Sequence, residues 1–504
     1  MMKFAYRVIN NSLKVALAIW VLAAQFSNIA VADEGTQAHG VDESRLRELI
    51  REEIARALKS QSKTGDDTSN GLSSAIRSEL ASEVEKTEAK PRINYGSKPD
   101  SVDLDPHYTQ VKRKGRKIPF EFDLSGYGDI RYSFYDYDES VNRPEGSRNS
   151  SRTAFDLTRF VTKLEAEYEP AGIEIEAEVE FEHGGTGSAK ELEFEEFGEF
   201  ENDVENGGEI LVEELYVKKE FDDWTVRAGR FYVGVGLLSD YYTPLDYLAT
   251  ARSETETTLL PAVWDEIGIS VERKFSNSKL TMQVVNGLDS SGFGSSRWIA
   301  TGHQEKFEVN KADDLAYVLR YDFNVHENWL VGGSAYYADS TSGNRPRDDL
   351  DVDGDVLLVS GHTAYIGERL SARGMALWGA LGDAAEISER NSRLSNNLGV
   401  ERTPVAEEAL GVWGELGYDV APWLDVSAIH RVEPFFRLDY YDSFYKAAPG
   451  TFDNPKFERF VYTPGLAYTY MNSITAKFDW SLREYGGSGI GNQNTARFSI
   501  GFIF

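Results

Sequence analysis

The chain has 504 residues, of which 27% are charged and 41% hydrophobic, with a mean hydropathy of -0.43. Its 53 Lys and Arg stand against 83 Asp and Glu, and it has no Cys, so the sequence argues against nucleic-acid binding and excludes disulfides and thiolate metal sites. Low mean hydropathy also excludes a bundle of transmembrane helices, but not membrane-spanning strands, whose alternating pattern averages to neutral hydropathy.

The first 32 residues have the pattern of a secretory signal peptide. Lys3, Arg7 and Lys14 precede an apolar run at 15–26, and Ala30-Val31-Ala32 follows it. A positive segment, a short apolar segment and a small-residue site predict export with cleavage before Asp33. The alternative is a single membrane anchor, but the run is shorter than the roughly 20 apolar residues that a span requires.

Residues 33–119 form a separate predicted region on the periplasmic side. Apolar residues recur every three or four positions over 46–58 and again over 72–84, which predicts two amphipathic helices. The polar stretch 65–71 separates them. The pattern is compatible with a short coiled coil or with a solvated linker, because few heptads are present.

From residue 120 to 504 the sequence alternates with a period of two. In Ile173–Glu182, apolar and acidic residues swap strictly, so a strand would be apolar on one face and carboxylate on the other. A helix would scatter these Glu residues around its circumference. The same period recurs at 160–168, 315–323, 474–482 and 498–504.

The connections between these segments alternate between short and long. Tight turns such as 169–172, 222–223 and 472–473 alternate with polar stretches at 136–153, 184–208, 236–262, 289–312, 341–354, 384–406 and 440–456. This layout is typical of an outer-membrane barrel, which must close because no water in lipid can satisfy free backbone groups. We therefore predict an all-β fold, a transmembrane antiparallel β-barrel of about sixteen strands over 120–504, rather than a water-soluble sandwich. The predicted strand starts are 121, 155, 173, 210, 224, 264, 279, 314, 329, 355, 370, 407, 423, 457, 474 and 494.

Four tryptophans fall at the ends of predicted strands. They are Trp224, Trp264, Trp329 and Trp423. Indole rings favour the level of the lipid headgroups, so these residues are predicted to lie at the membrane interface.

Two segments resemble known outer-membrane proteins. The aromatic residues that alternate up to Phe504 resemble the terminal strand that the outer-membrane assembly machinery of Gram-negative bacteria reads. The order Gly229-Arg230-Phe231, Pro244, Arg252–Glu256, Leu259-Leu260-Pro261 and Trp264–Gly268 resembles the third-loop region of the phosphate-selective porin O/P family. The resemblance spans the barrel, with its motif in about forty residues, and departs at Val233-Gly234 and Tyr241–Thr243. It implies a homotrimer in the lipid bilayer of the outer membrane, whose third loop folds into the lumen.

The polar faces of the strands supply predicted pore-lining charges. Early strands contribute acids and later strands bases, which predicts a transverse field in a narrow pore. Nine carboxylates against six bases argue against phosphate selectivity and for weak cation preference or general passage of small polar and ionic solutes. Alternatively, the Glu ladder is merely a solvated inner face. The residues are Glu165, Glu167, Glu174, Glu176, Glu178, Glu180, Glu182, Glu266, Glu272, Arg320, Arg373, Arg431, Lys477, Arg483 and Arg497.

The loop 236–262 is the predicted constriction. It holds charges of both signs and aromatic rings that a solute could contact, namely Asp240, Tyr241, Tyr242, Asp246, Tyr247, Arg252, Glu254 and Glu256. The inward fold of this loop follows from the family resemblance. The same residues could instead pack the loop against the wall.

A second candidate site lies at residues 349–355. Asp349, Asp351, Asp353 and Asp355 surround Gly354 in the pattern of the first half of an EF-hand loop. Ser360 stands at the twelfth position, where that loop has Glu. The pattern suggests Ca²⁺ on an external loop, against the alternative of a solvated acidic loop, and no other cofactor is expected.

No catalytic residues are predicted. The seven His residues form no metal-binding motif, and neither a nucleophile elbow nor a phosphate-binding glycine loop is present. The sequence thus predicts a porin for passive diffusion of small hydrophilic or ionic solutes. Two alternatives remain open: a scaffold barrel that sheathes a partner protein, and a barrel-embedded hydrolase.

Overall fold

The computed structural model describes residues 120–137, 150–168, 171–184, 209–237, 239–304, 309–346, 350–394, 403–424, 426–427, 429–487 and 491–504. The chain divides into two compact units, Met1–Arg116 and Lys117–Phe504, and all described residues belong to the second. The predicted signal peptide and helical region 33–119 lie outside the described residues.

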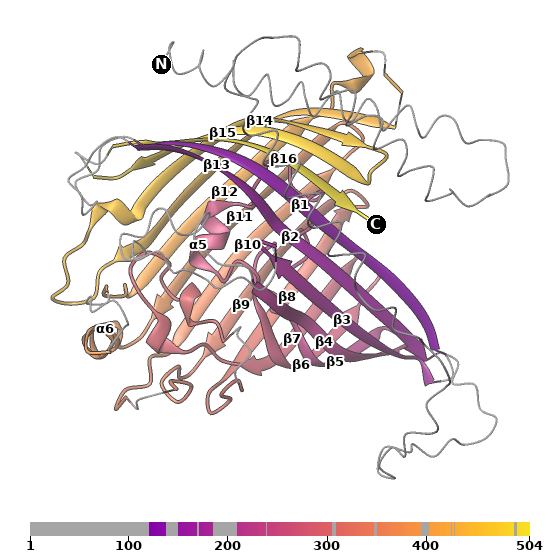
Figure 1. Cartoon of the computed structure of the whole chain (residues 1–504). Helices are drawn as coiled ribbons and strands as arrows, with labels where there is room; N and C mark the ends of the chain where they lie inside the picture. The colour runs from indigo at the N-terminus through magenta and orange to yellow at the C-terminus, as the bar shows by residue number, and fades with distance from the viewer. Residues whose placement is uncertain are drawn as a thin grey trace, which may run out of the picture. The chain divides into compact units, whose positions relative to one another are not determined.

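Sixteen antiparallel strands form one closed barrel, in which each strand pairs with its neighbours in sequence and β1 pairs with β16 (Figure 1). This confirms the predicted all-β barrel. The strands are β1 (Phe120–Tyr137), β2 (Ser150–Tyr168), β3 (Ile173–Glu182), β4 (Glu209–Phe221), β5 (Trp224–Tyr232), β6 (Asp265–Lys274), β7 (Ser278–Asn286), β8 (Leu315–His326), β9 (Trp329–Ala338), β10 (Val356–Ile366), β11 (Leu370–Leu381), β12 (Glu408–Tyr418), β13 (His430–Lys446), β14 (Glu458–Tyr470), β15 (Ile474–Tyr485) and β16 (Gln493–Ile503).

Fourteen of the sixteen strands start within one residue of the predicted position. The start of β2 at Ser150 is earlier than predicted, because β2 pairs with the full length of β1 up to Tyr137. The start of β13 at His430 is later than predicted, because Trp423 and Leu424 belong to the 3-10 helix η5 (Ala421–Leu424) instead of the strand. The predicted loop 440–456 is also wrong at its beginning, since β13 continues to Lys446.

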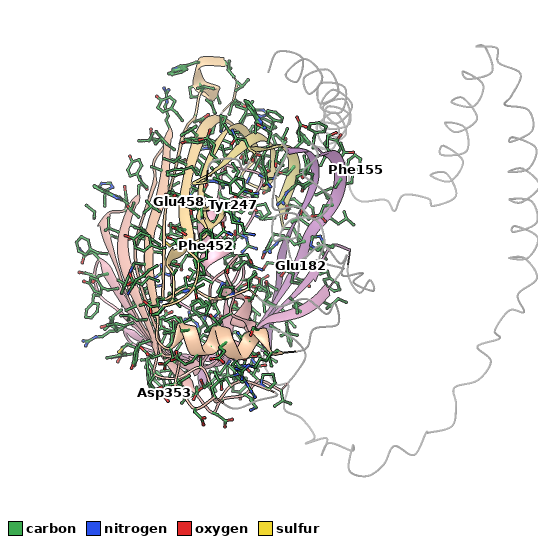
Figure 2. The ribbon with its side chains drawn as sticks, turned by 90° about the vertical axis from the view of Figure 1, so that its left-hand side faces the viewer. Phe155, Glu182, Tyr247, Asp353, Phe452 and Glu458 are labelled. Carbon is green, nitrogen blue, oxygen red and sulfur yellow. The ribbon has the colours of Figure 1, made fainter. Side chains whose placement is uncertain are left out.

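The strands expose apolar side chains outward and bury polar ones inward. On β6, Ile269 is 54% exposed while its neighbour Ser270 is fully buried. On β8, Leu319 is 53% exposed and Arg320 only 3%. Phe155 on the outside of β2 illustrates the same orientation (Figure 2). The alternation places the apolar face where lipid would lie and reserves the interior for polar chemistry.

The last strand closes the barrel against the first. The register joins Tyr132 to Phe498, and the amide of Gly126 donates to the carbonyl of Phe504 at 3.0 Å. The amide of Phe504 donates back to the Gly126 carbonyl at 2.9 Å. Closure therefore leaves no free sheet edge in the described barrel, as a spanning sheet requires.

The interior is not an open tube, because an apolar core fills part of it. Trp298, Leu288 and Tyr336 are fully buried in this core, which takes most of its wall residues from β7 to β12 and further ones from β4, β5, β13 and β14. The loops supply short helices to it: α5 (Glu254–Leu259), α6 (Ala384–Ser392), η3 (Ser290–Gly292), η4 (Ala300–Gly302) and η6 (Pro455–Phe457). Among the described residues, no helix is long and apolar enough to cross a membrane.

Three of the four predicted interfacial tryptophans are exposed at the short-turn end of the barrel, namely Trp224, Trp329 and Trp423. The prediction is wrong for Trp264, which is 6% exposed and packs on Tyr336 at a ring-centroid distance of 4.9 Å. Trp264 belongs to the loop before β6 and not to the strand, so its ring enters the apolar core.

Candidate functional site

The loop between β5 and β6, residues 233–264, lies inside the barrel. Its Ser253 hydroxyl donates to Asp439 Oδ1 on β13 at 2.6 Å. Strand β13 is eight strands around the barrel from β5, on the opposite wall. The loop therefore crosses the interior from one wall to the other. We call it the inner loop.

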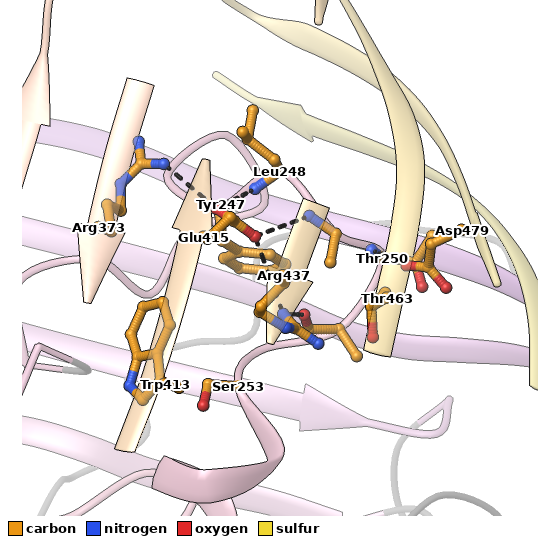
Figure 3. Close-up of polar contacts among 12 residues, drawn as sticks. Tyr247, Leu248, Thr250, Ser253, Arg373, Trp413, Glu415, Arg437, Thr463 and Asp479 are labelled. Atoms are coloured by element: carbon orange, nitrogen blue, oxygen red, sulfur yellow. Dashed lines mark hydrogen bonds and ion pairs between the residues drawn. The ribbon is translucent and has the colours of Figure 1, made fainter. Parts of the chain in front are cut away.

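Inward-facing carboxylates on the far wall hold the main chain of the inner loop. Glu415 on β12 accepts the amide of Leu248 at 3.0 Å and that of Ala249 at 3.3 Å, and Asp479 on β15 accepts the amide of Thr250 at 2.6 Å (Figure 3). Hydrogen bonds to charged groups contribute about 1.5–3 kcal/mol each. These acids fix the path of the loop through the interior.

Inward-facing bases hold the carbonyl groups of the same segment. Lys477 on β15 donates to the carbonyls of Pro244, Tyr247 and Ala249, the last at 3.1 Å. Arg437 on β13 donates to the Ala251 carbonyl at 2.7 Å. Amides and carbonyls of the loop are thus satisfied by charges of opposite sign on the wall, which replaces the hydrogen bonding that a strand or helix would supply.

The short helix α5 forms within the loop because its first turn is capped. Ser253 is the N-cap, and its side chain accepts the amide of Glu256 at 3.4 Å. The Glu256 carboxylate accepts the amide of Leu237 at 2.7 Å and the indole N–H of Trp413 at 3.1 Å. Gly411 on β12 leaves room for the helix, since a Cβ there would lie 2.4 Å from Thr255 Cγ2. Local sequence and wall contacts therefore agree on the position of α5.

A cavity of about 580 Å³ lies between the inner loop and strands β1 to β4 and β13 to β16. Its lining among the described residues includes eight basic and six acidic side chains. The basic ones are Arg131, Arg159, Arg252, Arg297, Lys311, Arg459, Arg483 and Arg497, and the acidic ones are Asp129, Asp156, Glu180, Glu182, Glu254 and Asp289. The cavity carries a small excess of positive charge.

Ion pairs across the cavity lining fix several of these side chains. Arg159 lies 3.1 Å from Glu180, and Arg483 lies 2.8 Å from Glu254 of the inner loop. Arg459 lies over the Tyr441 ring, with its guanidinium carbon 5.6 Å from the ring centroid. Ion pairs and ring contacts therefore hold these lining side chains in place.

Two groups on loops facing the cavity have shifted pKa values. Burial, together with the carboxylate of Asp129, raises the pKa of Tyr247 to about 12, so its hydroxyl stays protonated at neutral pH. The hydrogen bond to Asp156, at 2.7 Å, raises the pKa of His183 above its usual value of 6.5. His183 therefore keeps a positive charge on the cavity wall to a higher pH than a free histidine.

All fifteen predicted pore-lining side chains lie on the inward faces of their strands, but they divide into groups with different surroundings. Glu180, Glu182, Arg483 and Arg497 line the cavity. Arg320, Arg373 and Lys477 contact the inner loop, and Glu266 is fully buried beside Trp264 and Asn286. Glu176 and Glu178 are buried on β3, and Glu165, Glu167, Glu174, Glu272 and Arg431 lie nearer the short-turn end.

The eight predicted constriction residues all belong to the inner loop, and three of them, Tyr247, Arg252 and Glu254, line the cavity. The others anchor the loop. Asp240 pairs with Arg320 at 2.5 Å, Tyr241 lies 5.7 Å from the Arg373 guanidinium, and Tyr242 packs on Tyr232 with ring centroids 5.2 Å apart. Asp246 accepts the Thr243 amide at 2.9 Å, and Glu256 accepts the Leu237 amide and the Trp413 indole N–H, as described above.

Sequence reasoning missed several cavity residues, namely Arg131, Arg159, Arg297 and Arg459. Arg159 shares the inward parity of Lys163 and Glu165, so extending the alternation by two positions would have found it. Arg297 lies on a loop, where parity gives no signal. Arg131 shares the inward parity of Asp129 and Ser133 on β1, so the alternation of that strand would also have found it.

The predicted calcium loop is described only in part. Asp349 lies outside the described residues, and Asp351, Asp353 and Asp355 are exposed. Gly354 has a φ of +65°, as the sharp turn in that pattern requires. A calcium ion at this loop stays a prediction.

The described strands define a closed, sixteen-stranded antiparallel barrel with an apolar exterior and a charged cavity inside. No family model and no curated protein matches this chain. Similar solved structures are the anion-selective porin from Comamonas acidovorans (11% identity, TM-score 0.44, 76% of this chain and 100% of that one), OprB of Pseudomonas putida (12%, 0.47, 76% and 94%) and the outer membrane channel DcaP of Acinetobacter baumannii (11%, 0.45, 77% and 99%). Sequence identities this low assign neither a family nor a solute to this chain. Membership of the phosphate-selective porin O/P family therefore stays a prediction.

Proposed function

We propose that the chain is an outer-membrane porin, a passive channel for small hydrophilic and ionic solutes that the inner loop narrows. The observation that carries the proposal is the inner loop, which wall charges hold inside a closed barrel next to a charged cavity. A passive channel needs a fixed constriction rather than a catalytic group. The proposal includes a trimer in the outer membrane of a Gram-negative bacterium, with residues 33–119 in the periplasm.

The exterior of the barrel supports a membrane location. Leu164, Ile269, Leu319 and Val412 come from widely separated strands, and each is more than 40% exposed. Exposure of this apolar surface to water is unfavourable, whereas contact with lipid is favourable. Every strand pairs on both sides, so the bilayer would meet no free backbone groups.

The interior supports an off-centre path for solutes. Because most wall residues of the apolar core come from β7 to β12, the charged cavity beside β1 to β4 and β13 to β16 offers polar solutes the more favourable surroundings. Eight basic and six acidic described side chains line the cavity there. We therefore propose weak preference for anions, which differs from the weak cation preference that the inward charges alone suggest. The difference arises because many of the inward acids are buried or bond the inner loop.

The alternative of a sheath for a partner protein does not fit these observations. A sheath needs an interior that is free for its partner, whereas this interior holds the inner loop and the apolar core. No geometry among the described residues favours the hydrolase alternative over the porin.

Planar-bilayer recording tests the proposal. The purified full-length protein should give stepwise ion currents, and a KCl gradient should give a reversal potential of the sign that anion preference requires. A membrane that stays electrically silent after verified insertion would exclude a channel. A reversal potential of the opposite sign would keep the channel but reject the proposed selectivity.

A further inference from the structure

A second polar site lies on the inner wall, outside the cavity. Glu176 and Glu178 on β3 and Glu214 on β4 each offer an oxygen atom, and these atoms lie within 4.8 Å of one another. The three residues are 3%, 1% and 6% exposed. Three carboxylates at this distance repel one another strongly when they are buried and ionised.

A β-bulge adds a fourth carboxylate to this group. The register of β3 and β4 shifts between Glu178 and Val179, so the consecutive residues Glu213 and Glu214 are both buried, although strict alternation would send one outward. The Tyr232 hydroxyl lies 3.0 Å from Glu213 Oε2 and 3.1 Å from Glu178 Oε1, which places the two carboxylates side by side. The second oxygens, Glu213 Oε1 and Glu178 Oε2, are buried and accept no hydrogen bond from a described residue.

The neighbouring positive charges do not balance this group. With Glu180, five carboxylates are buried on β3 and β4. Two of them have a basic partner: Glu176 pairs with Lys163 at 2.5 Å, and Glu180 pairs with Arg159 at 3.1 Å. Glu178, Glu213 and Glu214 form no ion pair with a described basic side chain. Buried negative charge without a counter-charge costs several kcal/mol per group, so protons or a bound cation must compensate it.

We propose that Glu176, Glu178, Glu213 and Glu214 bind one divalent cation of the calcium type. The donors are carboxylate oxygens, which hard cations prefer, and no His of the described part of the chain joins them to favour zinc or a softer metal. Carboxylates from two paired strands can adjust to the variable geometry of Ca²⁺. Tyr232 and Tyr242 lie next to the site, and Lys163, whose side chain is 24% exposed, marks its open side. The cation would cross-link β3 to β4 under the inner loop.

This site does not depend on the proposed channel function, so binding is measured directly. The folded full-length protein in detergent is freed of cations with EDTA and titrated with Tb³⁺, whose emission nearby tyrosines sensitise, and then with Ca²⁺. The variants are Glu178→Gln and Glu213→Gln, which keep the shape of the side chain. Glu433→Gln is the matched control, because Glu433 is a buried, inward carboxylate on the opposite wall that pairs with Arg431 at 2.9 Å. Asp351→Asn tests the external loop.

We expect sensitised Tb³⁺ emission that Ca²⁺ displaces, with affinity at least tenfold lower in Glu178→Gln and Glu213→Gln and unchanged in Glu433→Gln and Asp351→Asn. A double variant, Tyr232→Phe with Tyr242→Phe, keeps all carboxylates and should lose most of the emission even if the Gln variants fail to fold. Absence of binding at millimolar Ca²⁺ would overturn the proposal, with protonation as the compensation. Binding lost only in Asp351→Asn, or emission unchanged in the tyrosine variant, would also overturn it.

Discussion

Lys477 and Tyr247 bind each other across the interior of the barrel. The ammonium nitrogen of Lys477, on β15, lies 4.1 Å from the ring centroid of Tyr247, on the inner loop. The same ammonium donates to the carbonyl of Tyr247 and to those of Pro244 and Ala249. One buried wall charge thus holds both the ring and the main chain of the loop where it borders the cavity.

Replacement of Lys477 by Met should loosen the inner loop without unfolding the barrel. The change removes hydrogen bonds to a charged donor worth about 1.5–3 kcal/mol each, while strand pairing remains. We expect more frequent closures and larger current noise in single-channel recordings. Arg431→Met is the control, because Arg431 is an inward base whose contacts are to Glu433 and the Glu368 carbonyl. Equal noise in wild type and Lys477→Met would show that the loop does not depend on this anchor.

Replacement of Arg252 by Gln should lower the anion preference that we propose for the channel. Arg252 lines the cavity and donates to the Ala262 carbonyl at 2.7 Å, a bond that the Gln amide can in part retain. Removing one positive charge from a narrow aqueous passage should reduce the anion-to-cation permeability ratio on the order of twofold. Reversal potentials in a KCl gradient measure the ratio, and Arg431→Gln, outside the cavity, should leave it unchanged. A ratio that does not move would place Arg252 away from the permeation path.

Anion preference should rise as the pH falls, because of His183. The hydrogen bond to Asp156 raises the pKa of His183 in the folded protein. The ion pair between the two residues is therefore fully present below a pH of about 6.5, the pKa of an unfolded histidine. It is lost as the pH rises through the higher pKa of the folded protein. Over the same interval the cavity loses one positive charge. His183→Asn should flatten this part of the pH profile of the reversal potential. Asn suits the site because the residue has a φ of +46°. A profile identical in the variant would assign the pH dependence to other groups.

A charge on the outer face should destabilise the barrel in lipid. Leu319 lies in the middle of β8 and is 53% exposed. Leu319→Arg should lower the free energy of unfolding from lipid vesicles by about 2–4 kcal/mol, because a charge near the middle of the bilayer is costly. Tryptophan fluorescence in a guanidinium titration measures the change, with Leu319→Ala as the reference for lost side-chain contacts. Equal stabilities of the two variants would argue that this face does not lie in lipid.

The strands could be predicted from the sequence because each one obeys a single rule. Strict alternation in Ile173–Glu182 and Leu315–Phe323 fixes both the strand and its inward face. The rule failed at Trp423 and Leu424, which continue the predicted turn as a 3-10 helix after β12, with Asp419 accepting the Ala421 amide. It also failed at Glu213, because a bulge has no signature in the pattern of polar and apolar residues.

The candidate site could be predicted only in part, because the destination of an inward side chain depends on the loops. Lys477 and Arg497 have the same inward parity, yet Lys477 binds the inner loop while Arg497 lines the cavity. Trp298 and Ile299 lie in a stretch that reads as a polar loop, but they are fully buried in the apolar core. Contacts between residues more than a hundred positions apart determine where these side chains lie, and the periodicity of the sequence does not encode such contacts.

The off-centre cavity has a consequence for biogenesis. Its wall combines β1 to β4 with β13 to β16, the two ends of the barrel segment, which meet where Gly126 pairs with Phe504. A sheet that lacks its final hairpins therefore lacks half of the wall that encloses this cavity. In the proposed porin, permeation would therefore begin only once β16 pairs with β1.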